Sequence, residues 1–193
     1  METEEETGAP APVPVFVGLG GSLRASSRTR SALAAALNLA AAAGATTHLL
    51  DPATLQLPIY HPDWALDDYP AASQAGIAEL LHWSRRAQLM LWASPTYHGT
   101  ISGVFKNALD FLEFASNDER PYLQGKAVGL IVVSDPGTFV AMAQAAHELR
   151  AWLAPTQVAL AGSDFSPERT LNSPRGERRV QRLVAELLDF AKR

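Results

Sequence analysis

The sequence predicts a doubly wound α/β fold, with a sheet of five parallel strands in the order 2-1-3-4-5 and helices on both faces. Strand and helix patterns alternate five times along the chain. The strand segments are continuous apolar runs, which is typical of a parallel sheet covered on both faces. In this order the sheet reverses direction between strands 1 and 3, so we expect a ligand crevice there, at the carboxyl ends of the strands.

The first strand is the short apolar run Val15–Leu19, which stops at two glycines. An Ala/Leu-rich helix follows over Thr29–Ala43, and Gly44 stands in the position of its C-cap. Thr46–Leu50 is the second strand. These segments form the first strand-helix-strand unit.

A loop rich in proline, Asp51–Pro70, leads to a helical pattern over Ser73–Arg86. Leu89–Ala93 then reads as a buried strand, and Pro95 ends it. We therefore expect the third strand to emerge from a long connection.

The C-terminal half repeats the alternation. Ser102–Ala115 has the strongest helical pattern, and Lys126–Val133 is an unbroken apolar strand. Thr138–Leu153 is expected to be helical, Gln157–Ala161 is the fifth strand, and Arg178–Lys192 is an amphipathic helix.

Composition indicates an ordinary globular protein, because 47% of its residues are hydrophobic and 19% are charged. A length of 193 residues suits one domain, expected over residues 15–193. The net charge of −4 gives no electrostatic reason to expect nucleic acid or an acidic membrane surface. The chain has no cysteine, which excludes disulfides and thiol redox chemistry. Any redox chemistry must therefore come from a cofactor.

Residues 1–14 are acidic and rich in Pro and Ala, without the basic and apolar regions of a signal peptide. We expect a flexible N-terminal tail there. No apolar stretch is long enough to span a bilayer, so a cytoplasmic location is expected.

The loop after the first strand, residues 20–29, has the features of an anion-binding site. It combines small residues, four hydroxyls and two arginines, and it ends at a helix N-terminus. Free N–H groups and the helix dipole favour an anion at such a position, and a guanidinium can bind two phosphate oxygens at once. The alternative is a well-capped helix behind a polar surface loop.

A monophosphate suits this loop better than a bridging pyrophosphate does. A P-loop would need a lysine that the loop lacks, and a dinucleotide fingerprint would need glycine where Leu23 stands. Asp51 ends the second strand, where a ribose-binding acid would stand, so the dinucleotide alternative stays open.

The most specific segment follows the third strand, over residues 94–110. Pro95 ends that strand, and Gly99 and Gly103 let backbone approach a ligand closely. Backbone amides beside the aromatic Tyr97 suit a flat aromatic cofactor.

Residues 95–110 resemble the P-x-Y-x-G-[ST]-x-x-G-x-x-K-N-A-[IL]-D segment of the NADPH-dependent FMN reductase family. The first loop is similar to the G-S-L-R-x-x-S motif of that family, with Gly21, Ser22, Leu23, Arg24 and Ser27 at the matching positions. The resemblance covers roughly residues 15–165, and the two motifs occur in the family's order. It implies a flavodoxin-like fold that binds FMN.

By the same resemblance, the FMN phosphate is expected at Ser22, Arg24, Ser27 and Thr29. The isoalloxazine ring is expected along the second loop, at Pro95, Thr96, Tyr97, His98 and Gly99. The family often has Asn where Thr29 stands and usually has Asn where His98 stands.

The loop after the fourth strand, residues 134–138, has fewer glycines than is common in the family. Ser134 and Gly137 are its expected cofactor contacts. This shortened form resembles the branch that supplies reduced flavin to monooxygenases, so a flavin-dependent monooxygenase is a candidate partner.

The long proline-rich loop brings aromatic residues to the same edge of the sheet. We expect Tyr60 and Trp64 to line a substrate pocket, although a packed surface loop would have the same composition. Lys106 and Asp110 read as an ordinary surface ion pair. The spacing of the histidines predicts no metal site.

Two classes of function remain open. One is an enzyme that takes hydride from NADPH or NADH and reduces free flavin, a quinone, an azo dye or a similar small-molecule acceptor. It needs no catalytic side chain, because the flavin carries the chemistry. The other is a flavodoxin-type electron carrier. Such carriers are usually more acidic than this chain and lack the second motif, so the enzyme is favoured.

Helix Ser102–Ala115 also predicts a homodimer or homotetramer. At about 100° per residue its apolar positions cover an arc of about 220°, wider than one core-facing stripe needs. The surplus residues, Phe111 and Phe114, are expected to be exposed unless a second subunit covers them.

Overall fold

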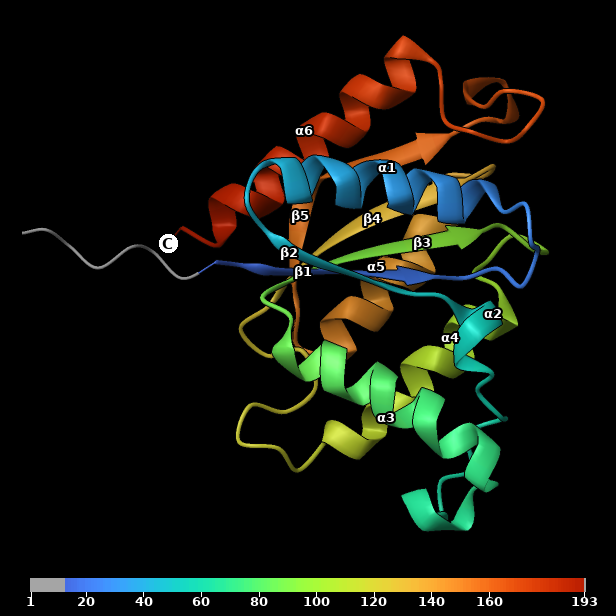
Figure 1. Ribbon diagram of the computed structural model, residues 1–193, viewed down its shortest axis with the longest axis vertical. Coiled ribbons are helices and arrows are strands. Elements are labelled where there is room, and N and C mark those ends of the chain that lie inside the picture. The colour runs from blue at the N-terminus through green and yellow to red at the C-terminus, as the bar shows by residue number, and fades with distance from the viewer. Residues whose placement is uncertain (1–12, 193) are drawn as a thin grey trace, which may run out of the picture.

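The structure, a computed structural model, describes residues 13–192. Its centre is a five-stranded parallel sheet in the order β2-β1-β3-β4-β5, so the predicted fold class and strand order are confirmed. All strands end at one edge, on the right in Figure 1. The strands are β1 (Val15–Gly20), β2 (Thr46–Leu50), β3 (Leu89–Pro95), β4 (Ala127–Val133) and β5 (Trp152–Leu160).

Helices cover both faces of this sheet (Figure 1). On one face lie α1 (Arg28–Ala42) and α6 (Pro174–Phe190). On the other lie α3 (Ala71–Arg86), α4 (Gly103–Asp110) and α5 (Thr138–Glu148). Short helical turns complete the fold: α2 (Pro52–Leu55), η1 (Leu66–Asp68), η2 (Phe111–Ala115) and η3 (Gly162–Asp164).

Two apolar cores lie on opposite sides of the sheet because neighbouring side chains of a strand point to opposite faces. In β3, Met90 and Trp92 join the core under α3, α4 and α5, whereas Leu91 and Ala93 join the core under α1 and α6. Both faces of the sheet are buried, which explains why the inner strands are continuous apolar runs.

The fifth strand was predicted wrongly at its start. Helix α5 ends at Glu148 instead of Leu153, and β5 begins at Trp152 instead of Gln157. Arg150 has a left-handed φ of 61°, which turns the chain out of the helix. β5 is an edge strand whose register shifts opposite Val128 and Leu130, and an edge tolerates Pro155 because proline can donate no ladder bond.

Other boundaries differ where capping or local turns decide them. α6 begins at Pro174, four residues before the expected start, because Ser173 caps it through the N–H of Gly176. The helix expected over Ser102–Ala115 divides into α4 and the 3₁₀ turn η2.

The proline-rich loop, residues 51–70, contradicts the expected exposure of Phe111. Phe111 is fully buried and Phe114 is half-buried, because Tyr60 and Tyr69 of the loop pack on Phe111 at ring distances of 5.5 and 5.4 Å. Asn107 of α4 holds the loop by accepting from the N–H of Tyr60 (2.9 Å) and donating to the carbonyl of Pro58 (2.7 Å). The wide apolar arc is therefore covered from within the chain.

Residues 13–192 contain no helix long and apolar enough to cross a membrane. The tail expected over residues 1–14 falls, for residues 1–12, outside the described part of the chain.

Helix α2, which belongs to the proline-rich loop, packs closely on Gly76 of α3, and a substitution at Gly76 tests this packing. A Cβ at Gly76 would lie 1.8 Å from the carbonyl oxygen of Leu55, so the Gly76→Ala variant must displace α2. We expect it to lose about 1–3 kcal/mol or more of unfolding free energy, measured by chemical denaturation. Gly103→Ala is the matched control, because a Cβ there meets nothing within 4 Å. Equal stability of the two variants would contradict this packing.

Candidate functional site

A cavity of about 170 Å³ opens at the carboxyl edge of the sheet, where the loops after β1, β3 and β4 meet. It brings together most of the predicted cofactor residues. Its lining comprises Ser22, Arg24, Ser27, Arg28, Thr29, Pro95, Thr96, Tyr97, Val133, Ser134 and Arg169. His98, Gly99 and Gly137 of the predicted set lie outside this lining. Arg28 and Arg169 line it although neither was predicted.

The loop after β1 presents buried hydroxyls to this cavity. Ser22, Ser27 and Thr29 are 8, 7 and 2% exposed. Ser27 is the N-cap of α1 and accepts from the N–H of Arg30 (3.3 Å), and its hydroxyl lies 2.7 Å from that of Thr29. Together with the unpaired N–H groups of the first helical turn, these hydroxyls form a cradle of donors for an anion.

Asp51 is already engaged, which counts against a ribose-binding role. Its carboxylate forms an ion pair with Arg30 and caps α2 by accepting from the N–H of Ala53 (3.1 Å). Arg30 also donates to the carbonyl of Ala25 (3.2 Å), so it ties the first loop to the end of β2. The geometry therefore favours the monophosphate interpretation over the dinucleotide one.

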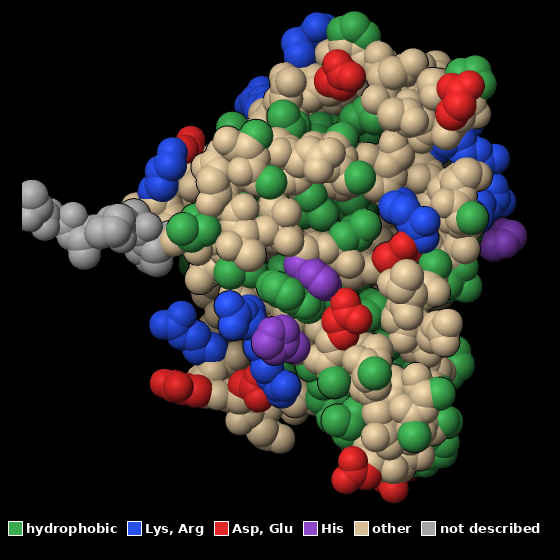
Figure 2. Space-filling model, in the orientation of Figure 1, with side chains coloured by type: hydrophobic (Ala, Val, Ile, Leu, Met, Phe, Trp, Pro, Cys, Tyr) green, Lys and Arg blue, Asp and Glu red, His purple; other side chains and the backbone are tan. Residues whose placement is uncertain are grey.

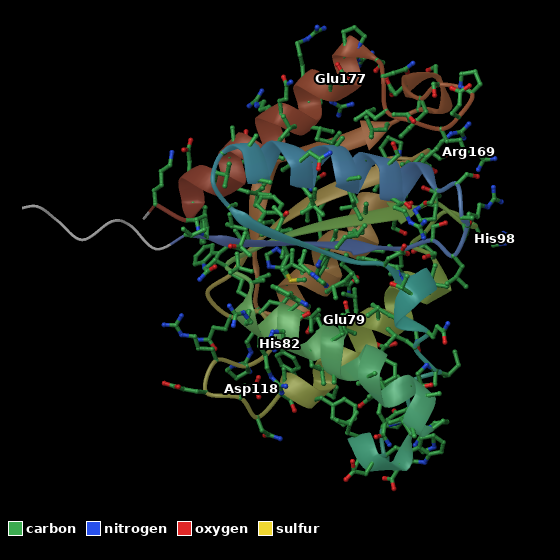
Figure 3. The ribbon with its side chains drawn as sticks, viewed as in Figure 1. Glu79, His82, His98, Asp118, Arg169 and Glu177 are labelled. Carbon is green, nitrogen blue, oxygen red and sulfur yellow. The ribbon has the colours of Figure 1, made fainter. Side chains whose placement is uncertain are left out.

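A tight turn forms the tip of the loop after β3. Tyr97 and Thr100 exchange two backbone hydrogen bonds of 2.9 and 3.1 Å, and His98 and Gly99 between them have φ values of 52° and 81°. The His98 side chain is exposed and lies at the edge of the molecule (Figure 3). The turn thus leaves the N–H groups of His98 and Gly99 at its tip, whereas Tyr97 reaches the cavity.

Hydroxyl side chains tie this loop to its neighbours. Ser102, the N-cap of α4, donates to the carbonyl of Gly21 (2.6 Å) and thereby joins the loops after β1 and β3. The hydroxyls of Thr96 and Thr138 lie 2.7 Å apart, and Thr96 also bonds the backbone of Asp135. These hydrogen bonds join the loops after β1, β3 and β4 to one another.

The loop after β4 contains a strained residue. Ser134 has a φ of 110°, and its N–H donates to the carbonyl of Leu160 (3.0 Å). Backbone strain of this kind is found at binding sites, where surrounding structure maintains it. Gly137 is exposed and donates to the Asp135 carboxylate (2.8 Å), so it shapes the start of α5 instead of lining the cavity.

A second cavity, of about 660 Å³, lies between α4 and α5 and is mostly apolar. Tyr60 lines it, together with Ile101, Leu109 and Leu149. Burial raises the pKa of Tyr60, and the charge of Glu113 raises it further, so its hydroxyl stays protonated and can donate.

Three other residues at this side of the molecule contact neighbouring side chains of the same chain. Trp64 does not line the cavity, because its ring packs on His61 at 4.9 Å and Tyr69 at 5.1 Å. Lys106 and Asp110 form the expected ion pair at the cavity rim.

Comparison with known proteins matches residues 15–165 to the model of the NADPH-dependent FMN reductase family. The NADPH-dependent FMN reductase ArsH of Shigella flexneri is 36% identical over 114 residues, which are 59% of this chain and 41% of that protein. An FMN-dependent NADPH-azoreductase of Staphylococcus aureus is 31% identical over 114 residues, covering 54% of this chain and 56% of that protein. The chain spans about half the length of these curated relatives.

Among solved structures, the NAD(P)H:acceptor oxidoreductase FerB of Paracoccus denitrificans has a similar fold. The TM-score is 0.70 at 18% identity, and the match covers 93% of this chain and 98% of that one. At this identity the likeness concerns the fold alone.

Proposed function

Because the chain belongs to the NADPH-dependent FMN reductase family, we propose that it binds FMN at the carboxyl edge of the sheet and passes hydride from NADPH or NADH to a small-molecule acceptor. The 170 Å³ cavity carries the proposal, since buried hydroxyls, a helix N-terminus and guanidinium groups converge on it. FMN supplies the redox chemistry when bound, accepting hydride and passing the electrons on. The chain, over residues 15–193, supplies binding and orientation.

The residues present fit FMN in two parts. The cavity is large enough for a phosphate but not for a three-ring system. We therefore assign Ser22, Arg24, Ser27 and Thr29 to the phosphate. We assign the ring to the loop after β3, at Pro95, Thr96, Tyr97 and the turn at His98 and Gly99. The loop after β4, with Ser134 and Gly137, is assigned to a third side of the ring site. The free N–H groups of the turn suit the polar edge of an aromatic ring.

We propose an aromatic acceptor, such as free flavin, a quinone or an azo compound. The names of the two curated relatives support this class. The larger cavity also supports it, because most of its surface is apolar, although Glu113 and Glu148 line it too, and Tyr60 offers a protonated hydroxyl. If free flavin is the acceptor, a flavin-dependent monooxygenase is the partner that would use the product.

A homo-oligomer, at least a dimer, also belongs to this proposal. Burial of Phe111 removes one argument for it, but the open apolar cavity between α4 and α5 supplies another. Exposed Val140 lies on α5, next to the cavity residue Ala141. We expect light scattering to report a dimer or tetramer at micromolar concentration. A monomer would contradict this part of the proposal.

Ligand preference tests the phosphate assignment. We expect FMN to bind more tightly than FAD or riboflavin in equilibrium titrations of the purified protein. Arg24→Ala should weaken FMN about tenfold to a hundredfold, because a charge-assisted hydrogen bond is lost, and should leave riboflavin nearly unchanged. Tighter binding of FAD than of FMN, or an unchanged FMN affinity in Arg24→Ala, would count against the assignment.

A flavodoxin-type carrier is the second candidate, favoured by the exposure of the turn at His98 and Gly99. A carrier needs only an exposed ring edge, whereas a reductase must let nicotinamide stack on the ring. We expect NADPH or NADH to bleach the FMN-loaded protein rapidly under anaerobic conditions, and turnover to continue when free FMN or a quinone is added. Stopped-flow absorbance measures this, with FMN and nicotinamide alone as the control. Slow reduction by both nicotinamides would favour the carrier.

A further inference from the structure

Arg169 reaches the cavity from a part of the chain beyond the segment matched to the family, residues 15–165. It lies in the β5–α6 loop, residues 161–173. Its guanidinium donates to the carbonyl of Ser26 (3.2 Å), which belongs to the loop after β1. Figure 3 shows Arg169 at the same edge of the molecule as His98.

The β5–α6 loop is held in place by its own hydrogen bonds. Phe165 and Leu171 form an antiparallel bridge, and Ser166 accepts from the N–H of Arg169 (2.8 Å). Leu171 in turn donates to the hydroxyl of Ser31 on α1 (3.0 Å). These contacts maintain the left-handed backbone of Arg169, whose φ is 66°. These contacts of the loop thus hold Arg169 at the cavity.

Three arginines, Arg24, Arg28 and Arg169, line this small cavity, and no Asp or Glu does. Figure 2 shows Lys and Arg side chains gathered at this edge of the molecule. Within residues 13–192 none of the three pairs with an acidic side chain, whereas the neighbouring Arg30 pairs with Asp51. Arg28 instead lies over the ring of Phe165, 5.9 Å from its centroid.

The three arginines thus place unpaired positive charge at one cavity of a chain whose net charge is −4. Cations that face one cavity repel one another, and a bound dianion relieves that repulsion. A guanidinium can also donate two hydrogen bonds to phosphate oxygens, which a lysine ammonium cannot match in geometry. The three arginines therefore favour an anion that carries more than one negative charge.

We propose that Arg169, supported by Arg28, binds the 5′-phosphate of FMN, so that the β5–α6 loop contributes to the phosphate site together with the motif after β1. The inference rests on the proposed function and adds to it a residue that determines the preference for phosphorylated flavin.

The test compares FMN and riboflavin in the variants Arg169→Ala and Arg169→Lys. We expect Arg169→Ala to weaken FMN about tenfold to a hundredfold and to change riboflavin less than about twofold. Arg169→Lys should recover part of the loss, because lysine keeps the positive charge but lacks the two parallel N–H donors of a guanidinium. The salt dependence of FMN affinity should also become shallower in Arg169→Ala. Arg178→Ala, an exposed arginine of α6, is the control and should match the wild type.

Three results would overturn the proposal. Equal weakening of FMN and riboflavin would mean that Arg169 only supports the loop. An unchanged FMN affinity would mean that Arg169 is a surface residue without a role in binding. A change in the KM for NADPH alone would mean that Arg169 binds NADPH instead of FMN. If the wild type bound FMN no better than riboflavin, the proposed function itself would fail, before any variant was compared.

Discussion

The hydrogen bond from the Ser102 hydroxyl to the carbonyl of Gly21 holds the two principal loops of the site together. Gly21 follows β1 where a side chain would be crowded, since a Cβ would lie 3.0–3.1 Å from Phe105, Ala93 and Ser102. The same hydroxyl caps α4 by accepting from Phe105, so one side chain fixes both the helix and the loop beside it. This hydrogen bond therefore joins the loop assigned to the phosphate to the loop assigned to the ring, at the point where the sheet reverses direction.

Most of the fold could be predicted because the inner strands are buried on both faces. Their apolar runs leave little ambiguity about where β1, β3 and β4 lie, and five alternations of strand and helix predict a doubly wound fold, for which 2-1-3-4-5 is a common strand order. β5 was misplaced because it is a half-exposed edge strand, in which Pro155 and a register shift obscure any pattern. The exposure of Phe111 was wrong for another reason, since helical periodicity counts apolar positions but cannot show that a distant loop covers them.

The site also contains residues that could be predicted from the sequence and residues that could not. Ser22, Ser27 and Thr29 could be placed from sequence because hydroxyls at a helix start act locally. Arg169 could not, since it follows no motif and reaches Ser26 only through the folded β5–α6 loop. His98 stands within the second motif, yet the left-handed turn directs its side chain away and leaves its N–H at the tip. Sequence reasoning thus located the loops, whereas backbone geometry decided which atoms face the cavity.

A division of labour between the two ends of the site follows from burial and charge. At the end proposed for the phosphate, the hydroxyls are buried and the loops are tied to one another. Arg30 is neutralised by Asp51, while Arg24, Arg28 and Arg169 keep their charge for the cavity. The turn at His98 and Gly99 is exposed and contributes only backbone donors. In the proposed binding mode, affinity for a phosphorylated flavin comes from one end, and the exposed turn leaves the ring end open to nicotinamide and to acceptors of different shape.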